Sequence, residues 1–166
     1  MSTFRWYDQF VSQDLPADPR ITAMGLFVEA FHGLSAKFQG QLAEHGLAAA
    51  EFEVLLRLSR SPRSELRMSD LAAQTQMSTS GITRVVDRLE RHGLVERRAC
   101  PADRRGAFAG LTPAGHARLT AALPDHLALI ERHFTGLLGP GRLDAMLEDL
   151  RTIRDAVRPD ATAGVA

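Results

Sequence analysis

The sequence predicts a mainly α-helical chain with one small β-hairpin, and three observations support this fold class. Apolar residues recur at steps of three and four over most of the 166 residues, which is the spacing that places them on one face of a helix. Residues 94–99 instead alternate with a period of two, and a turn at residues 101–103 leads to a second strand at residues 107–111, as in a hairpin. This hairpin directly follows two short predicted helices, and that order is typical of a winged helix-turn-helix.

The composition is that of a soluble globular protein. Apolar residues make up 45% of the chain and charged residues 24%, values that are ordinary for a folded domain. No apolar run approaches the roughly 18 residues that cross a bilayer, and the N-terminus has no apolar core typical of a signal peptide. The one cysteine, Cys100, excludes an internal disulfide and a cysteine-cluster zinc site. We expect a cytoplasmic protein with no cofactor and no membrane partner.

A long apolar stripe predicts the N-terminal helix. From Ile21 to Leu42 apolar residues follow helical spacing, and the helix is expected to end near Gly46. Residues 4–11 have the same spacing and predict a short extra helix before it. The next predicted helix carries Phe52 and spans about residues 52–58, where Ser-Pro closes it.

The predicted helix-turn-helix follows a polar loop at residues 63–67. Ser69 is placed to cap the first short helix, which is expected to end near Gln76. Ser78 or Thr79 then caps the second helix, and His92-Gly93 ends it, since glycine readily adopts the left-handed conformation. Its buried face is predicted to consist of Ile82, Val85, Val86 and Leu89.

The C-terminal part is predicted to be helical again. Thr112-Pro113 is typical of an N-cap and first-turn proline, and the helix that it starts contains Pro124 as a kink before the break at residues 139–141. A last helix covers residues 143–157. The predicted organisation is N-terminal dimerisation helices at 1–46, a winged helix-turn-helix DNA-binding region at 47–112, C-terminal dimerisation helices at 113–158 and a flexible tail at 159–166.

Charge is distributed unevenly although the net charge is zero. Residues 60–106 hold ten arginines and six acidic residues, a local charge of +4 that the rest of the chain balances. A basic middle segment of this kind provides an electrostatic footprint for nucleic acid. Opposite the apolar stripe of the second helix lies Arg84, which can pair with guanine in the major groove. The arginines of the hairpin suit a narrow minor groove, with Asp103 holding Arg105 in position. The residues predicted to bind double-stranded DNA are Ser78, Thr79, Ser80, Thr83, Arg84, Arg88, Arg98, Asp103, Arg104 and Arg105.

These segments resemble the MarR family of winged helix-turn-helix regulators. The resemblance covers residues from about 47 to 118. It is carried by Asp70-Leu71-Ala72, by the run from Gly81 to Glu90, by that from Gly93 to Arg98, by Asp103-Arg104-Arg105 and by Leu111-Thr112-Pro113-Ala114-Gly115. It implies a homodimer with interleaved terminal helices and repression or activation at a pseudo-palindromic operator. It also implies that the arginine at position 84 reads bases in some members and that the arginine at position 105 enters the minor groove.

The resemblance also implies a small-molecule effector, bound between the dimerisation helices and the winged domain. The residues predicted to bind it are Trp6, Phe27, Phe31, Phe52 and Glu53. The extra N-terminal helix with Trp6 is similar to the branch that responds to urate and related metabolites. That branch has an aspartate at the position of Glu53 and an arginine at that of Val85, so this chain differs from it at both positions.

Sequence alone leaves other functions to be weighed. An enzyme would need a nucleophile beside a base, a glycine-rich phosphate loop or firm metal-ligand spacing, and none of these patterns is found. A winged-helix module that had lost DNA binding would be expected to lose its wing arginines. Cys100 could sense oxidants, and His126 and His133 could bind zinc, although a role in a pocket or an interface suits these histidines better.

Overall fold

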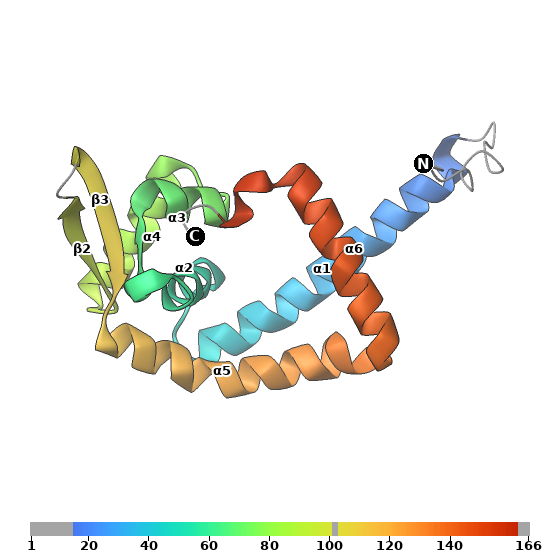
Figure 1. The fold of residues 1–166 in the computed structure, drawn as a ribbon. Coiled ribbons are helices and arrows are strands. Elements are labelled where there is room, and N and C mark those ends of the chain that lie inside the picture. The colour runs from blue at the N-terminus through green and yellow to red at the C-terminus, as the bar shows by residue number, and fades with distance from the viewer. Residues whose placement is uncertain (1–14, 101–102, 163–166) are drawn as a thin grey trace. The chain divides into compact units, whose positions relative to one another are not determined.

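The computed structural model describes residues 15–100 and 103–162, and only the backbone of residues 100, 103–105 and 162. It divides into two compact units, residues up to Lys37 and residues from Phe38 onward. Trp6 and the predicted helix at residues 4–11 therefore lie outside the described residues. Figure 1 follows the chain from its N-terminus to its C-terminus.

The first unit consists of a short 3₁₀ helix, η2 (Leu15–Ala17), and most of the long helix α1 (Pro19–Glu44). Asp18 precedes the helix, and its carboxylate accepts a hydrogen bond of 2.8 Å from the backbone N–H of Arg20. This contact satisfies one of the free N–H groups at the helix start. Several large apolar side chains on α1 are more than half exposed: Ile21, Met24, Leu26, Phe27 and Phe31.

The second unit contains the remaining elements in the predicted order. These are the end of α1, α2 (Ala49–Ser59), η3 (Pro62–Ser64), β1 (Glu65–Arg67), α3 (Met68–Thr75), α4 (Thr79–Arg91), β2 (Val95–Cys100), β3 (Asp103–Leu111), α5 (Pro113–His133), η4 (Thr135–Leu137), α6 (Pro140–Val157) and η5 (Pro159–Thr162). The mainly helical fold with a β-hairpin after a helix-turn-helix is confirmed.

The core lies where α2, α3 and α4 pack against one another and against the sheet. Val54, Leu55 and Leu58 from α2 are fully buried, and so are Leu71 from α3 and Val86 from α4. Each helix contributes one apolar stripe, as its periodicity requires. The core therefore fixes which face of α4 points outward.

The sheet has three antiparallel strands in the order β1-β3-β2. The sequence predicts only the hairpin, and it assigns residues 65–67 to a polar loop. That assignment is wrong, because Leu66 pairs with Ala109 and both side chains are buried. β3 also begins four residues earlier than the predicted strand at Ala107.

Other boundaries follow the predicted capping residues with one exception. Gly93 has φ 67° and ends α4 as expected, and the Thr112 hydroxyl accepts a hydrogen bond from the Gly115 N–H at 3.0 Å at the start of α5. Ser69 is not the N-cap of α3, since the helix begins one residue earlier, at Met68.

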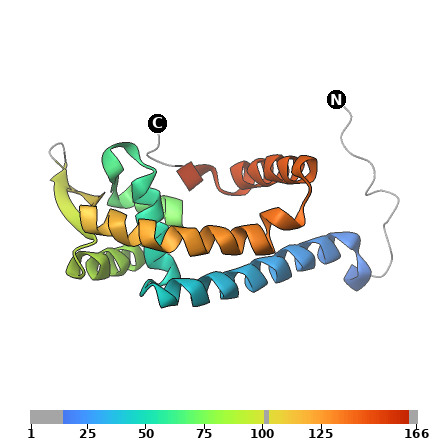
Figure 2. The ribbon, with the colours of Figure 1, turned by 90° about the horizontal axis from the view of Figure 1, so that it is seen from below.

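The end of the chain differs from the expected flexible tail. Figure 2 shows the chain turning back after α5, so that α6 leads to η5 beside the helix-turn-helix. η5 packs against α3, and Ala161 is 6% exposed. Residues 163–166 lie outside the described part.

Candidate nucleic-acid interface

The helix-turn-helix consists of α3 and α4 joined by a tight turn. Gln76 adopts the left-handed conformation with φ 57°, and Ser78 caps α4 by accepting a hydrogen bond of 3.1 Å from the Gly81 N–H. The predicted buried stripe of α4 is confirmed, because Ile82, Val85, Val86 and Leu89 are all at most 6% exposed. The opposite face of α4 therefore points away from the core.

The N-terminal half of that open face carries small polar side chains and one arginine. Ser78, Thr79, Ser80, Thr83 and Arg84 are all exposed. Among the described residues, no hydrogen bond or ion pair holds the Arg84 side chain. A guanidinium with its donors unoccupied can form a bidentate pair with a base edge.

Arg88, another predicted DNA-binding residue, is held by α2. Its Nε donates to Oε1 of Glu51 at 3.0 Å, and the second Glu51 oxygen accepts from the Ala48 N–H at 2.9 Å. Glu51 is 7% exposed, so this ion pair is shielded on one side. Arg88 thus fastens α4 to the start of α2 while part of its side chain stays exposed.

Arg97, on strand β2, points back to α4. Its guanidinium pairs with Asp87 at 2.5 Å and Glu90 at 2.9 Å, and donates to the Thr83 carbonyl at 3.2 Å. The backbone N–H of Arg97 also donates to Glu90 at 3.1 Å. Four contacts therefore fix the base of the wing on α4, and this arginine is not available as part of a free basic cluster.

Arg98, also on β2, pairs with acidic residues of the sheet. Arg98 pairs with Glu65 on β1 at 3.4 Å and with Glu96 on its own strand, so two carboxylates offset its charge. For Asp103, Arg104 and Arg105 the structure gives the backbone alone, as the first residues of β3. The predicted roles of these three residues stay predictions.

The predicted effector residues divide between the two units. Phe27 and Phe31 are exposed on α1, whereas Phe52 is buried in the second unit and Glu53 forms an ion pair of 3.5 Å with Arg57. Trp6 lies outside the described residues. This set stays a prediction.

Phe52 belongs to an aromatic cluster around His126 of α5. The imidazole lies 4.6 Å from the Phe52 ring and 4.8 Å from the Phe38 ring, measured between centroids. Its Nδ1 lies 3.0 Å from Oε1 of Gln41, whose amide nitrogen donates to the Ala122 carbonyl. Burial lowers the pKa of His126, because a low-dielectric setting disfavours the charged form. This histidine joins α1, α2 and α5.

A metal site is not evident in the part of the chain that the structure describes. There, no group of three or more His, Cys, Asp or Glu side chains is placed to hold an ion. Within the same part, no helix is long and apolar enough to cross a membrane.

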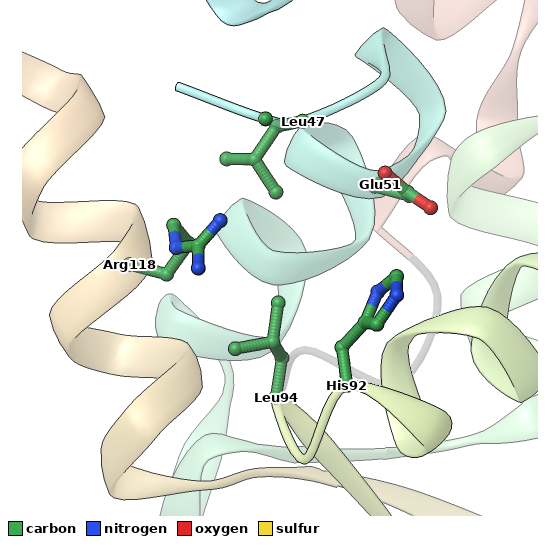
Figure 3. A pocket seen from close by; sticks show the side chains of 6 residues that line it. Leu47, Glu51, His92, Leu94 and Arg118 are labelled. Atoms are coloured by element: carbon green, nitrogen blue, oxygen red, sulfur yellow. The ribbon is translucent and has the colours of Figure 1, made fainter.

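A cavity of about 310 Å³ opens beside the end of α4, and the sequence analysis did not anticipate it (Figure 3). It is lined by Gly46, Leu47, Glu51, His92, Leu94 and Arg118. Arg118 from α5 faces the two leucines, and its Nη1 donates to the His45 carbonyl at 3.2 Å. The lining thus combines two charged groups, the Arg118 guanidinium and the Glu51 carboxylate, with the two leucines and His92. No short motif connects residues so far apart in sequence.

The comparisons with known proteins agree with this geometry. A model of the MarR family matches residues 45–106. The uncharacterized HTH-type transcriptional regulator YkoM of Bacillus subtilis is 32% identical over 123 residues, which cover 74% of this chain and 77% of that protein. The chain belongs to the MarR family. As a MarR-family protein it is a transcriptional regulator.

Two solved structures extend the comparison. The MarR-family regulator Sco3205 of Streptomyces coelicolor, solved in complex with DNA, matches with a TM-score of 0.78 and 30% identity, over 83% of this chain and 87% of that one. BpsR of Bordetella bronchiseptica, whose DNA binding is regulated by 6-hydroxynicotinic acid, matches with a TM-score of 0.71 and 28% identity, over 81% and 99%. The MarR-family fold thus extends beyond the segment that the family model matches.

Proposed function

We propose that this chain is a ligand-responsive repressor that binds a pseudo-palindromic operator as a homodimer. The observation that carries the proposal is α4: its apolar stripe is buried, and its polar face begins with Ser78 and carries Arg84, which has no partner among the described residues. Small side chains at the start let such a helix enter the major groove closely, with its first N–H groups near a phosphate. The structurally similar regulator Sco3205 was solved in complex with DNA, which supports DNA binding by this chain.

Binding titrations on matched operator duplexes test the recognition helix. Replacing Arg84 with alanine is expected to cost about 1–3 kcal/mol and to relax the preference at one base pair. The matched control is Arg132→Ala, an exposed arginine of α5 outside the helix-turn-helix. If Arg84→Ala retains full sequence preference, the proposed register of α4 in the groove is wrong.

The wing is tested by Arg105 and Asp103. Arg105→Ala is expected to weaken binding to many sequences and to reduce any preference for A·T-rich flanks, because the residue is proposed to sense minor-groove width. Asp103→Ala is expected to weaken binding too, although it removes a negative charge, since Asp103 is proposed to orient Arg105. Tighter binding by Asp103→Ala would exclude that orienting role.

The homodimer is supported by apolar surface that one chain leaves exposed. Phe27 and Phe31 of α1 are more than half exposed, as are Ile153 and Val157 of α6. Large apolar side chains that a helix leaves exposed are candidates for burial against a second chain. We expect a dimer in sedimentation experiments and a midpoint of unfolding that rises with protein concentration. A monomer at micromolar concentration would refute this part of the proposal.

The ligand response has two candidate sites, and two variants distinguish them. Glu53→Gln changes the predicted effector set, and Arg118→Gln changes the cavity of Figure 3. The probe is 6-hydroxynicotinate, which regulates the DNA binding of the structurally similar BpsR and carries a carboxylate that Arg118 could pair with. The variant that abolishes a ligand-induced shift of melting temperature and of operator affinity identifies the site. If the parent protein shows no shift, this probe is not its effector.

Repression is tested separately from binding. Deletion of the gene is expected to raise transcription from promoters that the protein occupies, because a dimer on an overlapping operator excludes the polymerase. Lower transcription after deletion would show that the regulator is an activator, with the DNA-binding proposal unaffected.

A further inference from the structure

The segment that follows α6 contacts the helix-turn-helix of the same chain. Arg158 comes directly after α6, and its Nη2 donates to the carbonyl oxygens of Gln74 at 3.0 Å and Ala73 at 3.3 Å. η5 follows, and its residue Ala161 is buried. The Ala161 carbonyl also accepts a hydrogen bond of 3.4 Å from Arg57 of α2.

The two carbonyls that Arg158 contacts lie in the last turn of α3. The last carbonyls of a helix have no partner within the helix and carry its partial negative charge, so a cation at this end is stabilising. α3 has no basic residue in its own last turn. A residue more than 80 positions further along the chain therefore supplies the cation that this helix end lacks.

The end of α3 determines how the recognition helix is presented. Only Gln76 and Met77 separate Thr75 from Ser78, the N-cap of α4. The N–H groups of Gln76 and Met77 close the turn on Ala73 and Ala72, at 3.3 and 3.1 Å. Ala73 thus accepts from the turn and from Arg158, so a change at Arg158 acts directly on the turn.

We propose that Arg158 is a positioning residue for DNA binding, and that residues 158–162 form a C-terminal clasp that holds the turn between α3 and α4. The clasp begins where α6 ends, next to Val157, which belongs to the proposed dimer surface. It therefore makes operator affinity depend on the position of the C-terminal end of α6. This inference rests on the proposed DNA binding, and Arg158 acts through α3 without touching DNA.

The test uses the full-length protein with Arg158→Gln, Arg158→Lys and the control Arg154→Gln. Arg154 lies one turn earlier on α6, is exposed and pairs with its neighbour Asp155. We expect Arg158→Gln to bind the operator about 3- to 10-fold more weakly, which is the effect of losing one charge at a helix end. Lysine is expected to restore most of the affinity, and the control to bind as the parent does.

Two further readouts separate positioning from other roles. The dependence of affinity on salt should keep the parent's slope in Arg158→Gln, because no phosphate contact is lost. Amide hydrogen exchange at Gln76 and Met77 should become faster in that variant and stay unchanged in Arg154→Gln. Ala161→Asp, which keeps Arg158 but opposes burial of η5, should act in the same direction.

Several results would overturn the clasp. Operator affinity of Arg158→Gln within twofold of the parent would do so, and a salt slope reduced by about one would assign Arg158 to a phosphate instead. If the parent binds no DNA, the proposed function fails while amide exchange still tests the clasp. Unchanged exchange at Gln76 and Met77 then refutes it independently.

Discussion

Gly115, in the first turn of α5, provides a sharp test of the packing between α5 and the base of the wing. A Cβ atom at this position would lie 2.0 Å from the carbonyl oxygen of Leu94 and 2.8 Å from Cδ1 of Leu111. Since real Cβ atoms essentially never approach within 3.0 Å, the backbone would have to separate by at least 1 Å. Gly115→Ala therefore perturbs a backbone contact without removing any side chain.

Neither side of this contact is free to move. The Leu94 carbonyl accepts a hydrogen bond of 3.2 Å from the Thr112 N–H, and the Thr112 hydroxyl donates to the Gly93 carbonyl at 2.7 Å. Overpacking of this kind costs about 1–3 kcal/mol, and weakening a hydrogen bond adds about 1 kcal/mol. Alanine returns up to about 1 kcal/mol through its higher helix propensity. We expect a net loss of about 2 kcal/mol in the free energy of unfolding.

The assay is urea unfolding followed by circular dichroism at one fixed protein concentration, because dimerisation would otherwise shift the midpoint. The control is Gly40→Ala in α1, where a Cβ meets no atom within 4 Å. That variant is expected to gain about 0.5–1 kcal/mol. If the urea midpoint of Gly115→Ala equals or exceeds that of the parent, with an unchanged m-value, the backbone at Leu94 accommodates a Cβ atom at little cost.

Three further predictions concern caps and protonation. Ser78→Ala should lower the free energy of unfolding by about 1 kcal/mol, because the Gly81 N–H loses its acceptor. Ser78→Asp should restore most of this loss. An alanine variant as stable as the parent would show that Ser78 does not stabilise α4 as its N-cap. The hydrogen bonds from Arg20 lower the pKa of Asp18 from the ordinary 3.8 to about 2, so the ionised carboxylate stabilises the fold above pH 4 and this contribution is lost as the pH falls towards 2. In acid unfolding, the free energy of unfolding of Asp18→Asn should therefore decrease less steeply over that range than that of the parent. Equal slopes for the two proteins would contradict this. Burial lowers the pKa of His126 in the folded chain, so as the pH falls below about 6.5 the unfolded chain binds this proton more readily and the free energy of unfolding decreases. Between pH 7 and pH 5 the free energy of unfolding of His126→Gln should therefore decrease less than that of the parent. An equal decrease would show that His126 does not contribute to the pH dependence.

Patterns local in sequence predicted most of the fold. The stripe on α4 is fully buried, and Ser78, Gly93 and Thr112 act as the caps that their residue types favour. These features depend on residues three or four positions apart, which a single sequence displays. β1 was missed because it is three residues long and mostly polar, and its partner β3 lies about 40 residues further along.

The candidate site was predicted less completely, because periodicity shows which face a charge occupies and not what it pairs with. Arg88 and Arg98 were placed at the DNA surface, but their partners Glu51 and Glu65 come from distant elements. The residues of the clasp lie beyond the family motifs, and no short pattern predicts that Arg158 donates hydrogen bonds to the end of α3. The DNA-binding roles of Asp103, Arg104 and Arg105 are predicted from sequence alone, since the structure describes only the backbone of these residues.

The attachment of Arg88 and Arg97 limits how operator preference can be engineered. A recognition helix transplanted from a related regulator would carry new base contacts at position 84 and its neighbours. It would keep its seat on α2 and on the wing only if it also retained Arg88 together with the acids at 87 and 90 that receive Arg97. Chimeras that exchange the exposed positions 80, 83 and 84 alone should therefore change specificity with less loss of stability than exchange of the whole helix.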